Sequence, residues 1–436
     1  MSGRDTRNEP TVVVHTGAPA IEPDLERPLP RALRALAFRD VRLFLAGALG
    51  SSIGNNMQLA ALGWVVAVTT HSAVRVTLIA FVTIFPLVVL GPVGGALADR
   101  FARRRLLLLT QSALMAQAFA LWALWEADAA SYGVLFALSC VGGILIAVNT
   151  PAWQAIVPTL VPREYLQNAI TLNSTQFNVS RALGPMFAGL LIAHVGAGAC
   201  FLLNALSFVL VLIALVVMSP RAGTHAADPK ARTGVVAGFV ESVRYLRARR
   251  GLAVAIGTHG LFAMLAAPVV QLIPVLSVDA LHVGSEAFGL LLGSFGIGAV
   301  AVALVLGALD DRVAPSRLLG GGLVLSAIAV AGLGLSPGLG VGVLFMVAFG
   351  ASYVTVVAID HSAIQSLTDD RLRGRVTSLW LMTFGVFFPL GTILQGVVAD
   401  IVGVRAVLVA SGGLVILVTA ALAARRVLPA IDAAQP

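Results

Sequence analysis

Long runs of apolar residues, separated by short polar turns, occupy most of the chain. A bilayer core accommodates about 20 apolar residues per helix, so each run of this length indicates a membrane-spanning helix. The pattern predicts about twelve transmembrane helices, near residues 43–68, 76–98, 106–126, 132–157, 166–194, 199–218, 252–278, 287–309, 318–335, 339–362, 374–400 and 405–427. The predicted fold class is therefore an all-α membrane protein.

Polar segments lie at both ends and near the middle of the chain. Residues 1–30 are rich in Pro, Glu, Asp and Arg, and we expect residues 1–37 to be a disordered cytoplasmic tail. Residues 31–42 alternate Arg with apolar residues, as an interfacial helix that leads into the first span does. The predicted organisation is this tail, a first six-helix bundle (38–218), a cytoplasmic linker with an amphipathic helix (219–250), a second six-helix bundle (251–427) and a cytoplasmic tail (428–436).

Composition supports a membrane protein and argues against several other classes. The chain is 58% apolar and only 11% charged, whereas about a quarter of the residues of a soluble domain are charged. Its net charge of +8 is spread between apolar runs, so we expect contact with membrane lipids and no nucleic acid. Cys140 and Cys200 lie in or beside apolar segments, and no metal spacing, nucleotide loop or nucleophile–base set is present. We therefore expect no cofactor, no metal and no enzyme activity.

The basic residues are distributed asymmetrically between the two sides of the predicted membrane. Of the 29 Lys and Arg residues, 26 fall in the termini and the even-numbered loops, while Arg75 and Arg405 fall on the other side and Arg181 lies within a span. The positive-inside rule then predicts that both termini are cytoplasmic. The excess of Ala, Gly, Val and Arg, with Lys230 as the only lysine, suggests a GC-rich bacterial genome. The expected location is the inner membrane of a bacterium.

An internal repeat divides the twelve spans into two sets of six. GALADRFARRRL (95–106) and GALDDRVAPSRL (307–318) are identical at eight of twelve positions, and each follows the second span of its set. REYLQNAITL (163–172) and DDRLRGRVTS (369–378) correspond more weakly before each fifth span. Two pseudo-symmetric six-helix halves are typical of transporters, whose substrate site lies between the halves near the bilayer midplane.

These motifs also resemble those of a known family. The residues that carry the resemblance are GNNMQLAALGW (54–64), GGALADRFARRR (94–105), the segment 149–191 and LRGRVTSLW (372–380). The chain is similar to major facilitator superfamily transporters of the secretion-effector and multidrug-efflux branch, which includes enterobactin and macrolide exporters. The resemblance implies a monomeric secondary active transporter that exports small molecules by alternating access, coupled to protons. An importer or lipid flippase on the same fold, or a non-transporting receptor, remains as an alternative.

The charged loop after the second span is the first candidate for a mechanistic role. The resemblance implies that Asp99 meets the N-terminus of the eleventh span, near Gly374, when the cytoplasmic side is shut. A carboxylate at a helix N-terminus gains about 0.3–1 kcal/mol, which would bias the conformational equilibrium by that amount. The other candidate gating residues are Arg100, Arg103 and Arg104 in this loop and Asp311 and Arg312 in the second half. The alternative is a charged turn with no gating role.

Small residues indicate where the two halves pack against each other. The fifth span contains Gly184, Pro185 and Gly189, and the eighth span contains Gly289 and Gly293. Glycines at such spacing let helices approach closely, and proline removes a helix hydrogen bond. We expect these two spans to pack across the interface of the halves. Generic helix packing with no mechanistic role is the alternative.

Arg181 is the strongest single candidate for a substrate-binding residue. It lies 11–15 residues into the fifth span, near mid-membrane, where an arginine is costly and commonly functional. Helical periodicity places several polar or aromatic residues on or beside its face and on the first span at similar depth. The predicted cavity comprises Arg181, Asn173, Gln176, Phe177, Ser180, Asn55, Asn56 and Gln58. A structural arginine that pairs with backbone carbonyls is the alternative.

The predicted spans contain no carboxylate near their middle, since Asp360 is assigned to a cytoplasmic end together with other acids. The buried charge is therefore positive, and this motivates a small-molecule substrate that is anionic, or polar and neutral. His259 is the only histidine well inside a span and is a weak candidate for proton coupling. A lone histidine in such a position is more often a packing residue.

Overall fold

The computed structural model describes residues 30–219, 244–246, 248–309, 313–369 and 372–434. Within these ranges the chain is almost entirely helical and contains no strand. The first half comprises α1 (Arg39–Thr70), α2 (Ala73–Arg100), α3 (Arg103–Glu126), α4 (Tyr132–Ile156), α5 (Leu166–His194) and α6 (Ala197–Val217). The second half comprises α8 (Arg250–Leu265), α9 (Val269–Val275), α10 (Ser285–Leu309), α11 (Pro315–Leu335), α12 (Leu339–Leu367), α13 (Arg373–Val402) and α14 (Val404–Ala424).

These helices confirm the predicted all-α membrane fold. Ten of the described helical segments are long and apolar enough to cross a bilayer. The two other long helices, α1 and α5, have 32 and 29 residues and carry several polar side chains. With α8 and α9 counted as one span, the described residues provide the twelve membrane-length elements that the hydropathy pattern predicts.

The seventh span differs from its prediction because it is broken. The chain leaves α8 after Leu265, resumes as α9 at Val269 and continues into a π-helical turn, Leu276–Ala280. Pro268 lies at the break, where its missing N–H group and its ring interrupt the helix. The break redirects α9 so that it packs against α1 and α2 of the first half.

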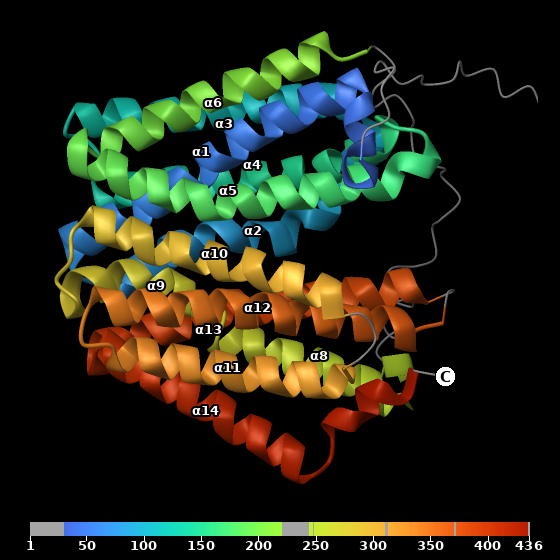
Figure 1. Cartoon of the computed structure of the whole chain (residues 1–436). Helices are drawn as coiled ribbons and strands as arrows, with labels where there is room; N and C mark the ends of the chain where they lie inside the picture. The colour runs from blue at the N-terminus through green and yellow to red at the C-terminus, as the bar shows by residue number, and fades with distance from the viewer. Residues whose placement is uncertain (1–29, 220–243, 247, 310–312, 370–371, 435–436) are drawn as a thin grey trace, which may run out of the picture.

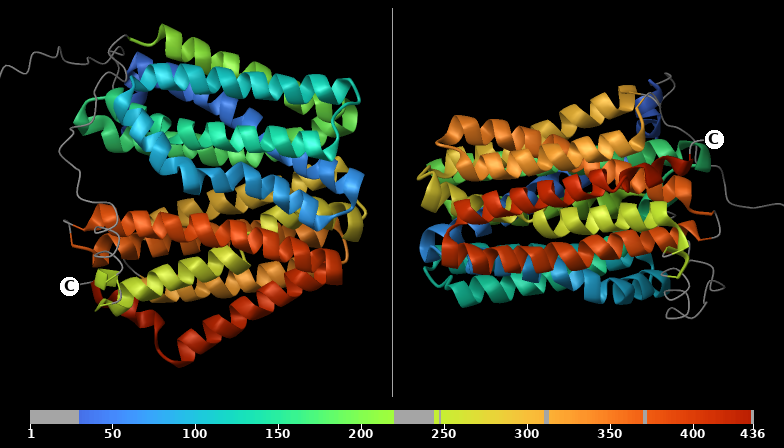
Figure 2. Two further views of the ribbon diagram at one scale, coloured as in Figure 1. Left: turned by 180° about the vertical axis from the view of Figure 1, so that it is seen from behind. Right: turned by 90° about the horizontal axis from the view of Figure 1, so that it is seen from below.

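The two halves form two stacked layers with the same internal arrangement (Figures 1 and 2). In the first half α2 packs on α4, α1 on α5, and α3 on α6. The equivalent pairs in the second half are α10 on α12, α8 on α13, and α11 on α14. The halves meet through α5 with α10 and through α2 with α13. These two contacts are equivalent under the same pseudo-twofold relationship, as expected for a duplicated transporter fold.

One end of the interface between the halves is closed by polar contacts. His71 Nδ1 lies 2.7 Å from Asp279 Oδ1, and His194 Nε2 lies 3.0 Å from Glu286 Oε1. Asp400 accepts hydrogen bonds from Ser72 Oγ at 2.7 Å and from the backbone N–H of Ala73 at 2.5 Å, at the start of α2. All three contacts join the two halves, so this end is sealed. We call it the closed end.

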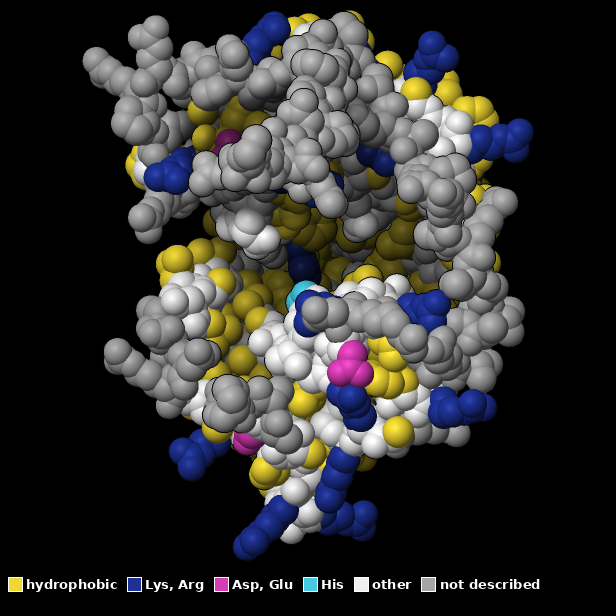
Figure 3. Space-filling view, turned by 90° about the vertical axis from the view of Figure 1, so that its right-hand side faces the viewer, with side chains coloured by type: hydrophobic (Ala, Val, Ile, Leu, Met, Phe, Trp, Pro, Cys, Tyr) yellow, Lys and Arg dark blue, Asp and Glu magenta, His cyan; other side chains and the backbone are white. Residues whose placement is uncertain are grey.

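The opposite end, where Arg31–Ala37 and Leu428–Ala434 lie, is hollowed between the halves (Figure 3). Asp99, at this end of α2, is exposed. A Cβ built on Gly374, in the first turn of α13, would meet no atom within 4 Å. We call this the open end; the structure therefore represents a state that is open at one end only.

The described segments near both termini pack onto the helix bundle. Residues Arg31–Ala37 form a 3-10 helix, in which Ala35 is fully buried and donates its N–H to Asn168 Oδ1 at 2.7 Å. The expected disorder of residues 1–37 is thus corrected for 31–37, because this segment packs on the start of α5. Residues 1–29 and most of the linker 219–250, including most of its expected amphipathic helix, lie outside the described residues, as do Asp311 and Arg312.

The C-terminal segment also folds onto the bundle. Leu428–Ala434 forms a 3-10 helix whose Leu428 and Ile431 are buried. Asp432 accepts hydrogen bonds from both the backbone N–H (2.8 Å) and the hydroxyl (2.5 Å) of Ser316, at the first turn of α11. A carboxylate in this position satisfies free N–H groups and complements the helix dipole.

Candidate functional site

Arg181 of α5 connects the two halves through aromatic side chains. Its guanidinium carbon lies 5.4 Å from the centre of the Phe295 ring on α10 and 5.5 Å from the centre of the Tyr353 ring on α12. Both distances are within the range of cation–π attraction. Among the described residues, no carboxylate lies within ion-pair distance of Arg181, and no hydrogen bond to its guanidinium is present. The positive charge of Arg181 is therefore stabilised by the Phe295 and Tyr353 rings and is not neutralised by a described carboxylate.

A cavity of about 130 Å³ lies beside Arg181, between the halves. Its walls come from α1, α2 and α5 of the first half and from α9 and α10 of the second. The polar side chains among the described lining residues are Asn56, Arg181 and Gln271, and the remaining lining residues are apolar. Arg181 is the one charged side chain in this part of the lining. Apolar walls with a few convergent polar groups are typical of small-molecule sites.

Glycines explain how the sequence brings these walls together. A Cβ on Gly189 of α5 would lie 2.8 Å from the Cα of Gly289 on α10, and a Cβ on Gly289 would lie 2.8 Å from the carbonyl oxygen of Pro185. A Cβ on Gly293 would collide with Met186. The structure therefore brings together α5 and α10 through Pro185, Gly189, Gly289 and Gly293, and this approach positions Phe295 against Arg181.

Gly184 does not take part in that contact. A Cβ there would lie 3.0 Å from the carbonyl oxygen of Ile53 and 3.0 Å from the backbone nitrogen of Met57, both on α1. The expectation that Gly184 packs across the interface is corrected, because it faces α1 within the first half. Its role is to let α5 approach α1 beside Asn56, the α1 residue that lines the cavity.

Two α1 residues predicted for the cavity belong to a polar network inside the first half. Asn204 of α6 donates to Gln58 Oε1 at 2.8 Å and to Asn55 Oδ1 at 3.5 Å. Gln58 Nε2 in turn lies 3.5 Å from Gln117 Oε1 on α3. The prediction that Asn55 and Gln58 line the cavity is corrected by these contacts. Buried amides in a membrane helix bundle are stabilised by such interhelical hydrogen bonds.

The predicted α5 residues on the open-end side of Arg181 also lie outside the described lining of this cavity. Ser180 is fully buried and donates to the carbonyl oxygens of Gln176 at 2.8 Å and Leu49 at 3.5 Å, so it is a packing residue against α1. Phe177 is 50% exposed. Asn173 Oδ1 and Gln176 Oε1 are buried and accept no hydrogen bond from the described residues.

The basic residues after α2 contact helix ends of their own half. Arg103 donates to the carbonyl oxygen of Ala155 in the last turn of α4 at 3.1 Å, and Arg104 donates to that of Val216 in the last turn of α6 at 2.6 Å. Cations at helix C-termini satisfy free carbonyls and complement the helix dipole. Arg100 is exposed. In this state Arg103 and Arg104 therefore connect the start of α3 to the ends of α4 and α6 within the first half. Asp99, near the end of α2, is exposed.

A buried acid that sequence reasoning missed lies beside His259. Asp360 is fully buried, seven residues before the end of α12, and accepts a hydrogen bond from Thr258 Oγ1 at 3.0 Å. Its second oxygen lies 3.7 Å from His259 Nδ1. The expectation that Asp360 occupies a helix end is wrong because α12 extends five residues beyond the predicted span, to Leu367. The pair lies outside the described lining of the Arg181 cavity.

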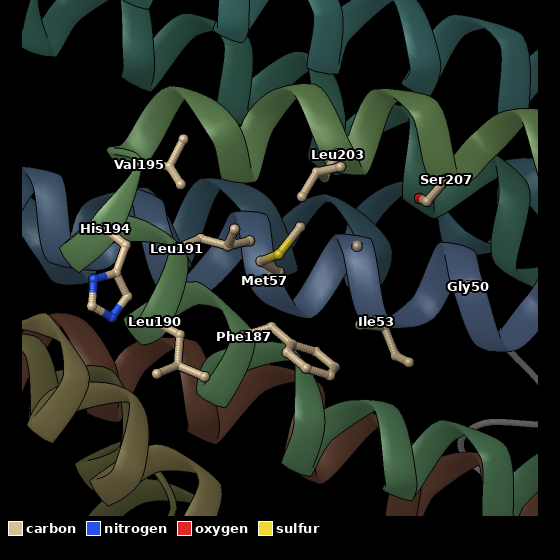
Figure 4. Close-up of a pocket in the computed structure, with 11 residues that line it drawn as sticks. Gly50, Ile53, Met57, Phe187, Leu190, Leu191, His194, Val195, Leu203 and Ser207 are labelled. Carbon is tan, nitrogen blue, oxygen red and sulfur yellow. The ribbon is translucent and has the colours of Figure 1, made fainter.

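A second hollow lies on the first half, where α5 and α6 straddle α1 (Figure 4). It has a volume of about 460 Å³ and a nearly apolar lining that includes Met57, Phe187, Leu190 and Leu203. His194 lies at its closed-end margin (Figure 4). Gly50 and Gly54 of α1 also line it, and a Cβ on Gly54 would lie 2.5 Å from Asn204 Oδ1, so this glycine lets α6 approach α1.

The duplicated six-helix architecture with a cavity between the halves defines a major facilitator superfamily transporter, a class whose members are not enzymes. Within that class, the sequence model of the "Transmembrane secretion effector" family matches residues 31–436, and the chain belongs to this family. The predicted resemblance is thereby confirmed.

Characterised relatives include siderophore and drug transporters. The chain is 25% identical to the staphyloferrin A transporter of Staphylococcus aureus, over 81% of this chain and 87% of that one. It is 27% identical to the multidrug efflux pump Tap of Mycolicibacterium fortuitum, over 84% and 91% of the two chains. It is 26% identical to the enterobactin exporter EntS of Citrobacter koseri, over 71% and 73%.

Solved structures show the same fold at lower identity. A POT family transporter in complex with a thioalcohol-conjugated peptide superimposes with a TM-score of 0.71 at 12% identity, over 89% of this chain and 96% of that chain. A bacterial homologue of the lysosomal transporter Spinster, in an inward-facing and unoccupied conformation, gives a TM-score of 0.69 at 16% identity, over 93% and 98%.

Proposed function

We propose that this protein exports small molecules across the cytoplasmic membrane of a bacterium by alternating access, driven by the proton gradient. The observation that carries the proposal is the Arg181 cavity, which lies between two pseudo-symmetric halves that are joined at one end and separated at the other. Rocking of the halves about such a cavity exposes it to each side in turn. Efflux relatives of the same family support the outward direction.

The open end faces the cytoplasm in this proposal. Both described ends of the chain lie there, and the positive-inside rule assigns that side to the cytoplasm, since 26 of 29 basic residues fall in the termini and the loops at this end. The structure then corresponds to an inward-open state, ready to take substrate from the cytoplasm. The protein acts as a monomer in which the bundles 38–218 and 251–427 are the moving parts.

The substrate is anionic, or polar and neutral. Arg181 supplies the one charge among the described lining residues, and Asn56 and Gln271 supply neutral hydrogen-bonding groups. Asp360 does not alter this balance, because it is fully buried next to His259 and does not reach the cavity. Apolar walls and the Phe295 ring suit a substrate with an aromatic or other apolar body.

Asp99 acts when the open end closes. In the closed arrangement it meets the N-terminus of α13 near Gly374, where no atom now lies within 4 Å of a built Cβ. A carboxylate there would stabilise that state by about 0.3–1 kcal/mol. Asp311 and Arg312 are proposed to do the same in the second half. Arg103 and Arg104 hold the first half's loop against α4 and α6, and the exposed Arg100 is proposed to act with Asp99 at the gate.

Reconstitution in liposomes tests the proposal. Three probes of similar size and different charge are 2,3-dihydroxybenzoyl-serine (anionic), chloramphenicol (neutral) and ethidium (cationic). We expect the purified protein to move the anionic or the neutral probe against its gradient when a pH gradient is imposed, and to stop when the gradient is collapsed. Selective movement of ethidium would contradict the proposed substrate class. Movement that ignores the pH gradient would contradict proton coupling.

A lipid flippase is the second candidate, and the apolar hollow between α1, α5 and α6 favours it. A lipid mover requires a lateral opening of this kind. The same liposomes separate the two functions when they contain a fluorescent phospholipid in one leaflet. Lipid movement that survives loss of the proton gradient, without movement of the soluble probes, would replace export by flipping.

A further inference from the structure

The second half contains a buried pair of titratable groups that the substrate cavity does not use. His259 on α8 is 1% exposed and Asp360 on α12 is 0% exposed, and His259 Nδ1 lies 3.7 Å from Asp360 Oδ2. Taking either charged form out of water is costly unless a partner compensates it. If these two positions served only to stabilise the fold, apolar side chains would be favoured there. The presence of two titratable side chains therefore indicates a functional role.

The hydrogen bonding of the pair is incomplete where the two groups face each other. Thr258 Oγ1 donates to Asp360 Oδ1, but within the described part of the chain Asp360 Oδ2 and both ring nitrogens of His259 have no hydrogen-bond partner. Buried polar atoms that serve only a structural purpose are normally satisfied. Here the atoms without partners, Asp360 Oδ2 and the ring nitrogens of His259, can share one proton between the two side chains.

Electrostatics favours a single bound proton. Without it, a neutral imidazole and a carboxylate leave a net negative charge in an apolar site. With one proton the pair is neutral overall, either as imidazolium and carboxylate or as imidazole and carboxylic acid. The sealed site therefore retains one proton and releases it when water reaches the pair.

Aromatic side chains surround the His259–Asp360 pair, and one of them contacts a further titratable group. The indole of Trp380, on α13, stacks on the His259 ring with centres 4.5 Å apart, and Phe384 of the same helix lies 5.7 Å from it. Trp380 also contacts the ring of His361 at 4.8 Å, and His361 is only half-buried. Among the described residues, His361 is the one further titratable group in ring contact with this cluster.

Charged groups on the same elements are Arg250 at the start of α8 and Arg373 and Arg375 at the start of α13. Beyond them, Arg249 and Asp369 form an ion pair at 3.0 Å, just before α8 and after α12. Both are exposed at the open end, so they are screened from the buried pair. The Trp380 ring contacts both His259 and the half-buried His361, and so connects the buried pair to a partly exposed group.

We propose that His259 and Asp360 form the binding site for the coupling proton, that Trp380 is its movable cover, and that His361 relays the proton to the open end. The proton enters from the outer side, is held between His259 and Asp360, and leaves through His361; no other bond is made or broken. The inference rests on the proposed proton-driven export, and it names the site that performs the coupling.

Helix α12 connects this site to the substrate cavity. Tyr353, which contacts Arg181, and Asp360 are seven residues apart and therefore lie on the same face of the helix, about two turns from each other. A change at Arg181 that moves α12 therefore changes the distance between Asp360 and its partners on α8 and α13. The proton and the substrate are in this way coupled without contact.

Proton binding is measured first, without any substrate. Protonated imidazole quenches a stacked indole, so tryptophan fluorescence of the purified full-length protein is recorded against pH, with Trp380→Phe defining the contribution of Trp380. We expect a titration that is absent in His259→Asn, has a changed midpoint in Asp360→Asn, and persists in His361→Asn. The matched control Asp369→Asn, which removes an exposed acid, should leave it unchanged. A Trp380 signal that ignores pH, or that titrates normally without Asp360, would overturn the inference.

Transport then separates this inference from the proposed function. With 2,3-dihydroxybenzoyl-serine in liposomes, Asp360→Asn should lose gradient-driven movement and keep exchange of labelled for unlabelled compound. Asp360→Glu should restore part of the gradient-driven movement, and Asp369→Asn should behave as wild type. Full gradient-driven movement by Asp360→Asn would overturn the site but leave proton-driven export intact. If wild type itself moves the compound without regard to the gradient, the proposed function fails, and the fluorescence titration still decides whether the pair binds a proton.

Discussion

Arg181 of the first half lies over the ring of Phe295 in the second half, with 5.4 Å between the guanidinium carbon and the ring centre. The contact joins the two bodies that must move relative to each other in alternating access. It is also next to the cavity, so a substrate that binds Arg181 competes with the ring for the same charge. This competition gives the substrate a direct means to shift the conformational equilibrium.

Replacement of the ring tests that competition. Phe295→Leu removes a cation–π attraction of about 0.5–2 kcal/mol and leaves Arg181 freer to meet an anion. We expect tighter binding of an anionic substrate and slower return of the empty transporter, seen as a lower KM together with a lower kcat. Phe119→Leu is the matched control, because Phe119 packs on Trp122 in the first half, away from the cavity. An unchanged KM in Phe295→Leu would show that the ring does not compete.

Asn56 and Gln58, two residues apart on α1, should respond differently to the same substitution. Asn56→Leu changes the described lining of the cavity and is expected to alter which probe is transported. Gln58→Leu removes the partner of Asn204, and interhelical hydrogen bonds in membranes are worth about 0.6 kcal/mol on average. It should therefore lower thermal stability and leave probe selectivity unchanged. Altered probe selectivity in Gln58→Leu would show that Gln58 does line the cavity.

The close approach of α5 and α10 should tolerate no side chain. Gly289→Ala places a methyl group 2.8 Å from the Cα of Gly189, and overpacking of this kind costs about 1–3 kcal/mol. We expect a lower melting temperature and a wider separation of the halves at the closed end. The control is Gly413→Ala on α14, where a Cβ meets nothing within 4 Å. Equal melting temperatures for the two variants would mean that α5 and α10 can move apart to accept the methyl group without loss of stability.

Asp400 should hold the closed end shut. It binds Ser72 and the first N–H groups of α2, and a carboxylate at a helix N-terminus contributes about 0.3–1 kcal/mol, or up to about 2 kcal/mol when partly buried. Asp400→Asn should shift the population toward opening at that end, measured as a longer distance between spin labels on the α1–α2 and α13–α14 turns. Asp128→Asn, an exposed acid at the same end, is the control. An unaltered distance distribution in Asp400→Asn would remove Asp400 from the gate.

Asp99 should matter only in the other state. In a background without Cys140 and Cys200, cysteines at positions 99 and 374 are expected to cross-link when the transporter turns over, and to stay apart in the open state described above. Asp99→Asn should slow turnover without changing the choice of probe. A change in probe choice would mean that Asp99 contacts substrate and is not a gate.

Hydropathy and the repeat predict the helices and the two halves, because both depend on residue type and spacing alone. The same information does not say which face of a helix meets which neighbour. Asn56 and Gln58 illustrate this limit: both are polar residues at similar depth, yet one lines the cavity and the other binds Asn204. Only the crossing of α1 with α5 and α6 distinguishes them, and that crossing depends on Gly184 and on packing far along the chain.

Asp360 shows a second limit. A polar segment after residue 362 ends the apolar run, so the predicted span stops there, but the helix continues to Leu367 because its last turns pack on neighbouring helices. The acid is consequently buried against His259 from α8, a contact between residues about one hundred positions apart. The break at Pro268 was visible in the sequence as a proline, but its effect on the path of the chain depends on contacts with the other half.

Arg181 is proposed to bind the transported molecule between the halves. The most direct measurement is gradient-driven movement of 2,3-dihydroxybenzoyl-serine in liposomes by Arg181→Ala, beside Arg75→Ala, which removes an arginine that also rests on an aromatic ring but lies outside the described cavity lining. We expect Arg181→Ala to abolish this movement and Arg75→Ala to retain it. Undiminished movement by Arg181→Ala, or an equal loss in both variants, would contradict the claim.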